Sequence, residues 1–265
     1  MKNSNLKTAF ILILAIALVA IFWFISQTNS FNWTELYRYQ GKQPYDLKLV
    51  HDHLENQVGS ANFSIQDKSF QSQQLPSNSA YVFIGVQAFY DPEEVDSLLA
   101  WVNQGNTAFF AVKALDYDLI GEFFDSLTCP PILKGNTAYL FDTTVVATLL
   151  HPAFKGQKAN FEYIGYQGPE KYDFGCFDGR LFCPDSPYEP LGLVQNTHVN
   201  FIRIPLGKGQ LLAHAAPVMF SNYFMTSYRE AAYVQAVLSH INSKEIVWDE
   251  YHRYPHQEYN IGSTG

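Results

Sequence analysis

Residues 80–112 read AYVFIGVQAFYDPEEVDSLLAWVNQGNTAFFAV, and this stretch decides the fold. It opens with a continuous apolar run over residues 80–86, typical of a strand that is covered on both faces of a sheet. Residues 91–94 (DPEE) predict a helix start, because they offer an Asp N-cap, a proline at the first helical position and acids in the first turn. Residues 107–112 form a second apolar run. We therefore predict a βαβ crossover whose two strands are parallel.

Elements on both sides of this unit are predicted from the same kinds of signal. Residues 143–196 are rich in glycine, proline and aromatic residues, and we expect a β-rich or irregular insertion there. Apolar periodicity and turn residues predict helices over residues 45–57, 116–127 and 228–241, strands over 62–65, 138–141 and 245–251, and an antiparallel hairpin of strands 198–205 and 209–215.

The N-terminal segment contains an uncharged apolar run over residues 8–26. At about 1.5 Å of rise per residue, a helix of this length approaches the thickness of a bilayer's hydrocarbon core. Lys2 and Lys7 precede the run, which by the positive-inside rule places the N-terminus in the cytoplasm. A cleaved signal peptide is the alternative, but residues 22–28 lack a small-x-small cleavage pattern. We therefore expect an uncleaved single-pass transmembrane anchor, with the main domain in the periplasm or another extracytoplasmic space.

The composition indicates a folded domain and limits its partners. The chain has 265 residues, a hydrophobic content of 47% and a formal net charge of −8. The hydrophobic content is typical of a packed core, and the acidic balance argues against a nucleic-acid partner or an electrostatic grip on anionic lipid. We expect a cytoplasmic end with the anchor over residues 1–27, an extracytoplasmic α/β domain over 28–254, and a polar tail over 255–265.

Several short blocks beyond the N-terminal run are similar to one bacterial family. They are residues 44–45, 81–86, 91–105, 207–210, 214–217, 220–223 and 247–251. On these blocks the chain resembles the family called domain of unknown function 4350, and residues 143–196 lie outside the resemblance.

The resemblance implies a fold, a location and a missing segment. The implied fold is flavodoxin-like or class I glutamine amidotransferase-like, a mainly parallel sheet flanked by helices. The implied location is the bacterial inner membrane, in an envelope protein with no assigned reaction. The family also implies a second membrane helix, which this sequence does not contain, so we expect the chain to be truncated.

The motifs of common catalytic and cofactor sites are absent from the sequence. An amidotransferase-like fold would need a Cys nucleophile on a tight strand-to-helix turn, yet the turn over residues 85–89 carries neither Cys nor Ser. Residues 207–209 (GKG) lack the spacing of a phosphate-binding loop and are typical of a β-turn. His51 and His53 point to different sides of a helix and cannot share one metal ion. We therefore expect no cofactor and no metal.

A polar cluster near the C-terminus is the remaining candidate site. If residues 245–251 form a parallel strand, Asp249, Glu250 and His252 lie at its carboxyl end, where ligands gather in open α/β sheets. His214 could reach the same crevice. The alternative is a structural cluster in which a carboxylate pairs with Arg253.

The cysteines leave a further question open. Cys176 and Cys183 could form a disulfide across a short loop in an oxidising compartment, or they could be two reduced thiols.

Our favoured hypothesis is a non-catalytic domain that binds a partner protein or an envelope ligand. The alternatives are an envelope hydrolase that uses the Asp/Glu/His cluster, and an accessory subunit of a transporter or an ATPase-linked complex.

Overall fold

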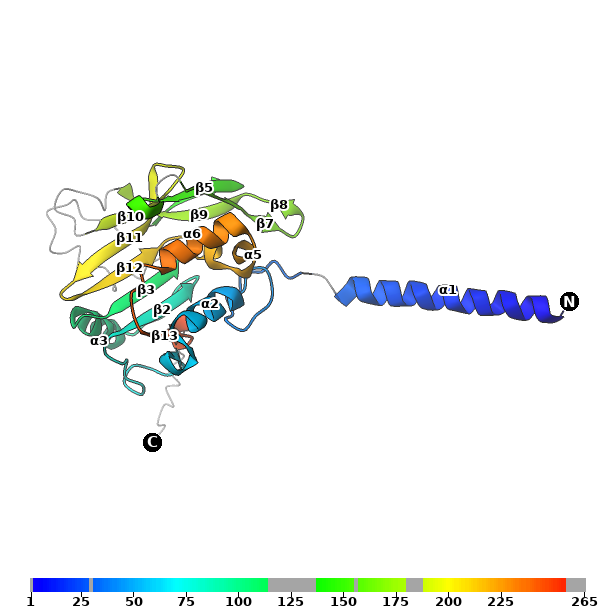
Figure 1. The fold of residues 1–265 in the computed structure, drawn as a ribbon, viewed down its shortest axis with the longest axis horizontal. Helices are drawn as coiled ribbons and strands as arrows, with labels where there is room; N and C mark the ends of the chain where they lie inside the picture. Colours follow the sequence, from blue (N-terminus) through cyan, green and yellow to red (C-terminus); the bar gives the residue numbers. More distant parts are fainter. Residues whose placement is uncertain (1, 29–30, 114–136, 155–156, 180–187, 256–265) are drawn as a thin grey trace, which may run out of the picture.

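The computed structural model describes residues 2–28, 31–113, 137–154, 157–179 and 188–255 (Figure 1). The predicted βαβ unit is present: β2 is Ser79–Gly85, α3 is Pro92–Asn103 and β3 is Thr107–Val112. β2 and β3 pair in parallel, as predicted. α3 starts at Asp91, whose backbone N–H donates to the Glu94 carboxylate at 3.3 Å, as in a capping box.

Nine strands of the described chain form one sheet, in the order β1-β13-β2-β3-β12-β11-β10-β5-β6. The first five strands in this order are parallel to their neighbours, and every pair from β12 to β6 is antiparallel. The remaining strands of this sheet are β1 Phe63–Gln66, β5 Thr144–Leu149, β6 Ala159–Glu162, β10 Glu189–Val194, β11 His198–Leu206, β12 Gly209–His214 and β13 Glu245–Asp249.

This mixed sheet shows that the predicted flavodoxin-like or class I glutamine amidotransferase-like fold, a mainly parallel sheet flanked by helices, is wrong. The parallel half matches the prediction, because β2 and β3 are joined by a helical crossover. The other half combines the β5–β6 hairpin with the consecutive strands β10, β11 and β12, where a short connection allows only antiparallel neighbours. The antiparallel β10–β5 pair joins these two groups across a long stretch of sequence.

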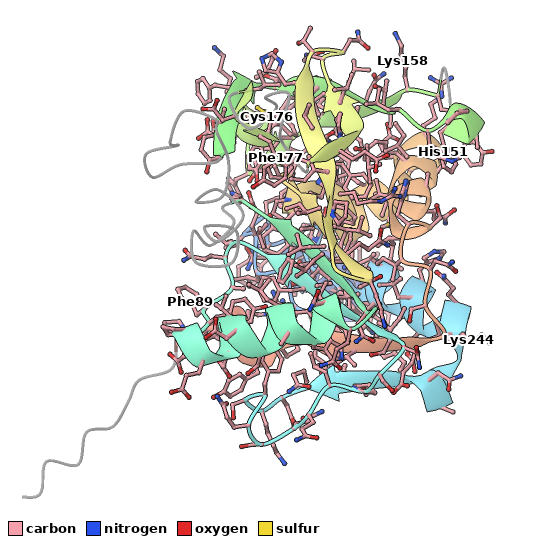
Figure 2. The ribbon with its side chains drawn as sticks, turned by 90° about the vertical axis from the view of Figure 1, so that its left-hand side faces the viewer. Phe89, His151, Lys158, Cys176, Phe177 and Lys244 are labelled. Carbon is pink, nitrogen blue, oxygen red and sulfur yellow. The ribbon has the colours of Figure 1, made fainter. Side chains whose placement is uncertain are left out.

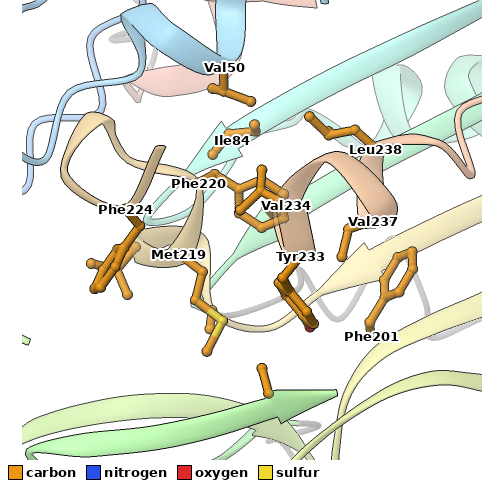
Figure 3. Packing of buried hydrophobic residues seen from close by; sticks show 14 of the residues in the cluster. Val50, Ile84, Phe201, Met219, Phe220, Phe224, Tyr233, Val234, Val237 and Leu238 are labelled. Carbon is orange, nitrogen blue, oxygen red and sulfur yellow. The ribbon is translucent and has the colours of Figure 1, made fainter. Parts of the chain in front are cut away.

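Helices cover the two faces of the parallel half. α3 packs its apolar stripe on one face, against side chains such as Tyr81, Phe83 and Phe110. α2 (Lys48–Val58) and α6 (Tyr228–Leu238) pack on the other face, as Figure 1 shows, against Val82 and other residues of the alternate strand positions. Figure 3 shows buried side chains of this second core, including Phe220, Phe224 and Val234, where α6 meets η4 (Pro217–Phe220) and α5 (Asn222–Met225).

The predicted insertion over residues 143–196 is largely part of the sheet. β5, β6 and β10 all come from it and extend the antiparallel half. It also supplies β9 (Tyr172–Phe177), which pairs with β4 (Thr137–Asp142), and the short pair β7 (Ile164–Gly165) and β8 (Gly168–Pro169). The remaining short elements are η1 Ser60–Asn62, η2 Pro152–Phe154 and η5 Tyr251–Arg253. The helix predicted over residues 116–127 lies outside the described residues.

α1 (Lys2–Thr28) precedes the sheet domain. In the part of the chain that the structure describes, no helix has both the length and the apolar character needed to cross a bilayer. This finding overturns the predicted single-pass anchor, and with it the predicted inner-membrane localisation with a periplasmic domain.

The β11–β12 turn explains the GKG sequence without any phosphate site. Gly207 has a φ of 57°, and Lys208 donates its backbone N–H to the Asn103 carbonyl at 3.1 Å. A Cβ on Gly209 would collide with the carbonyl oxygens of Val102 and Asn106, so the turn seats directly on the end of α3.

Replacing Gly209 by Ala is therefore expected to destabilise the fold by about 1–3 kcal/mol, because two backbone oxygens would have to move. The matched control is Gly179→Ala, where a Cβ meets no atom of the described residues within 4 Å and the expected change is within about 0.5 kcal/mol. Urea unfolding of both variants measures the difference. Equal stabilities would contradict this account of the turn.

Candidate functional site

Asp249 ends β13 by turning the chain. Its Oδ1 accepts the backbone N–H of Tyr251 at 3.0 Å and that of His252 at 3.4 Å, and the chain enters η5. The strand predicted over residues 245–251 therefore ends at Asp249. The turn instead folds the His252 ring back, with Nδ1 at 3.1 Å from both Asp249 oxygens. The structure thus brings Asp249 and His252 together, but through a turn rather than along a strand.

A second carboxylate, which the sequence analysis did not assign to the site, completes this cluster. Glu94 Oε2 lies 3.1 Å from His252 Nε2, so the imidazole sits between two carboxylates. We call Glu94, Asp249 and His252 the carboxylate–imidazole cluster. The only sequence signal for Glu94 is its place in the capping box of α3, which by itself indicates a helix start.

Aromatic side chains enclose the cluster. The Tyr81 hydroxyl lies 3.3 Å from His252 Nδ1 and 2.8 Å from the Tyr90 hydroxyl, and the Phe70 and Tyr90 rings lie 4.8 and 4.2 Å from the imidazole. Burial, followed by the charge of Asp249, raises the pKa of Tyr81 well above its ordinary value. Glu94 is 1% exposed, and Asp249 and His252 are 0% exposed. A general acid or base must contact its substrate, and these groups are closed off from solvent.

Glu250 faces away from this cluster and belongs to a structural ion pair. Its Oε1 accepts the Trp248 indole N–H at 2.7 Å, and both of its oxygens accept from Arg253, at 2.8 and 3.0 Å. Arg253 also donates to the Ile84 carbonyl at 3.0 Å, which ties the turn to the end of β2. The structural alternative raised for this carboxylate therefore matches the contacts of Glu250.

His214 lies on the opposite face of the sheet from His252. It ends β12, and its ring packs with Tyr233 of α6, whereas His252 lies among the residues on the α3 face. The Ala216 backbone N–H donates to His214 Nδ1 at 3.1 Å, so the neutral ring carries its proton on Nε2, 3.2 Å from the Tyr233 hydroxyl. Burial lowers the pKa of His214 to about 3. The predicted crevice with His214 and His252 together is not formed.

The carboxyl end of β3 is also occupied by internal contacts. Lys113 follows β3, and its ammonium lies 2.9 Å from Glu35. The hydroxyls of Tyr37, Tyr163 and Tyr172 donate to the same carboxylate at 2.6, 3.1 and 3.1 Å. The segment before α2 thus occupies the space at the carboxyl end of β3.

The predicted cysteine pair and the histidines of α2 give no further site. Cys176 is buried in β9, and Cys183 lies outside the described residues, so the disulfide stays a prediction. His51, Asp52 and Glu55 bring ligand atoms within 4.8 Å of one another, but Lys48 already donates to both Asp52 oxygens at 2.7 and 3.0 Å.

An accessible cavity lies instead along α6. It has a volume of about 440 Å³, within the range of ligand sites. We call it the α6 cavity. Its residues come from α6, β5, β6 and the segment between these two strands: Leu149, Phe154, Gln157, Lys158, Ala159, Tyr228, Arg229, Ala232, Tyr233 and Ala236.

A second cavity of about 530 Å³, which we call the His240 cavity, lies at the C-terminal end of α6. Phe154 lines both cavities, and Figure 2 shows His151 beside α6 and Lys158 further along the same end of the molecule. Sequence reasoning missed both cavities, because their walls come from segments far apart in the chain. The other residues of the His240 cavity are Ala153, Arg203, Gln210, Ser239, His240 and Asn242.

Comparison with known proteins gives a family and several distant fold likenesses. Residues 54–238 match the family described as "Domain of unknown function (DUF4350)". No curated protein matches the chain. An exo-β-1,4-mannosidase, Op5Man5, from Opitutaceae bacterium strain TAV5 is 15% identical with a TM-score of 0.44, covering 79% of this chain and 34% of that chain.

Two further solved structures are similarly distant. The mmIFT52 N-terminal domain is 9% identical with a TM-score of 0.47, covering 71% of this chain and 88% of that chain. A cytoplasmic protein from Salmonella typhimurium LT2 is 10% identical with a TM-score of 0.41, covering 71% and 86%. The chain spans about a third of the mannosidase's length, and TM-scores below 0.5 carry no statement about function.

Proposed function

The chain belongs to the DUF4350 family, as its sequence blocks predicted, and from this premise we propose that it is a non-catalytic domain that binds a small ligand in the α6 cavity. The observation that carries the proposal is a separation in space. Glu94, Asp249 and His252 of the carboxylate–imidazole cluster are buried and lie against one another, whereas the accessible α6 cavity is lined by other residues.

The α6 cavity has the features of a binding site. Its buried and half-buried residues, which we call the floor, are mainly apolar, and the exposed residues Gln157, Lys158 and Arg229 add polar groups. Binding sites commonly combine an apolar lining with a few polar groups that orient the ligand. Tyr233 at the base is held by Asn200 at 2.9 Å, which keeps this wall fixed before any ligand arrives.

The observed contacts give less support to the other functions expected from the sequence. A hydrolase that uses Asp249, Glu250, His252 and His214 would need these groups to converge on a substrate, and they lie in three separate sets of contacts. Binding of a partner protein and service as an accessory subunit stay predictions from the sequence.

A thermal-unfolding screen with a set of defined small molecules tests the proposal. Compounds that fit the α6 cavity should stabilise the wild-type protein, by about 2.7 kcal/mol when present at 100 times their Kd. Ala232→Trp fills the cavity from α6 and should abolish that stabilisation. The control is Ala100→Trp, which adds the same side chain at an exposed position of α3 and should leave it unchanged. Hits that stabilise Ala232→Trp as well as the wild type would overturn the proposal, as would the absence of any hit.

A further inference from the structure

We propose that the ligand of the α6 cavity is an organic anion with an apolar body, whose carboxylate, sulfonate or phosphate group is held by Lys158 and Arg229. This inference rests on the proposed function and names the chemical class of the ligand. It is carried by the charge around the cavity, by the apolar floor and by the cationic residues of the neighbouring cavity.

The charge at the cavity is opposite to that of the chain. The protein carries a formal net charge of −8, yet no acidic residue lines either cavity in the described ranges. Lys158 and Arg229 come from different elements, the approach to β6 and the first turn of α6, and both reach the α6 cavity. Neither forms an ion pair with another described residue, so both cations are available to a ligand.

The apolar residues of the cavity floor indicate the chemical character of the rest of the ligand. Leu149, Phe154, Ala159, Ala232 and Ala236 offer it only apolar side-chain surface. A free inorganic anion would gain nothing from this surface, whereas an aromatic or aliphatic body would be buried against it at about 25 cal/mol per Å². An amphipathic anion therefore satisfies both parts of the cavity.

The adjoining His240 cavity adds a second cationic set. Arg203 donates Nη1 to Glu189 at 2.9 Å, but its Nε–H is buried and has no hydrogen-bond partner in the described structure. The Arg203 side chain is 33% exposed and lines the cavity, so it adds positive charge there. His151 and His240 lie in the same cavity with their rings 6.3 Å apart. A ligand that extends past Phe154 could place a second anionic group at Arg203.

Two fluorescent probes of nearly equal shape test this inference. One is 8-anilinonaphthalene-1-sulfonate, an apolar body with one anionic group, and the other is N-phenyl-1-naphthylamine, the same body without charge. The wild type should bind the sulfonate about tenfold more tightly. Lys158→Gln combined with Arg229→Gln should remove this preference and leave the neutral probe's Kd unchanged. Lys68→Gln combined with Lys208→Gln makes the same change of charge away from the cavity. This control variant should keep the preference for the sulfonate probe.

The outcomes separate failure of the inference from failure of the proposed function. If both probes bind equally well and are lost in Ala232→Trp, the cavity binds ligands but does not select anions, and the inference is overturned. If the sulfonate preference survives the Lys158/Arg229 double variant, these residues are not the anion site. If Ala232→Trp affects neither probe, the α6 cavity is not the binding site and the proposed function fails as well.

Discussion

Lowering the pH from 7 to 4.5 is expected to remove about 3 kcal/mol of stability through His214 alone. Burial holds the folded-state pKa of this imidazole at about 3, whereas an unfolded histidine titrates at about 6.5. The unfolded chain therefore binds the proton first. The stability that depends on neutral His214 is complete above pH 6.5 and is lost progressively as the pH falls towards 3.

Contacts around the ring explain why the charged form is disfavoured. Nδ1 accepts the Ala216 backbone N–H, and a proton placed there would face another donor. His214→Asn keeps an acceptor near that position but cannot titrate. Urea unfolding at several pH values should show a shallower loss of stability for this variant than for the wild type. His198→Asn, at an exposed position, controls for the removal of one imidazole. Parallel curves for wild type and His214→Asn would contradict the prediction.

Replacing His252 by Leu is expected to lower the free energy of unfolding by about 3–5 kcal/mol. The imidazole lies 3.1 Å from carboxylate oxygens on both sides, and all three side chains are buried. Leu would leave Glu94 and Asp249 without this partner in a dry environment, and desolvated carboxylates are costly unless they are hydrogen-bonded. Chemical denaturation at pH 7 measures the loss.

A second substitution separates this electrostatic cause from simple loss of packing. Adding Glu94→Gln to His252→Leu removes one buried negative charge and should recover part of the lost stability. Packing alone predicts that the double variant is no more stable than the single one. A loss below about 1 kcal/mol for His252→Leu would show that the cluster contributes little, as surface pairs do.

The parts of the fold that the sequence predicted correctly depend on local signals. The crossover from β2 to β3 was predictable because its N-cap, apolar stripe and terminal glycine all lie within one short stretch. The β11–β12 hairpin was predictable for the same reason. The antiparallel half was not predictable. The pairing of β10 with β5 joins segments separated by most of residues 143–196, and no pattern in either strand indicates which strand it pairs with.

The candidate site shows the same limit. Asp249 and His252 were identified because they are close in the sequence, and their contact is local. Glu94 reaches them only after α3 has packed on the sheet, so its role depends on tertiary structure. His214 does not belong with them, because it lies on the opposite face of the sheet, and no local pattern indicates which face of a strand a residue occupies. The α6 cavity arises from the packing of α6 against β5 and β6, which sequence patterns do not describe.

The position of β13 has a consequence for how the protein is made. β13 lies between β1 and β2, and β1 pairs with no other strand of the described chain. A ribosome delivers β1 and β2 well before residues 245–249. Until then, one edge of β2 and the whole of β1 have unsatisfied backbone groups, which are open to pairing with other chains. Completion of the sheet, and protection from aggregation, must therefore wait until residues 245–249 have left the ribosome.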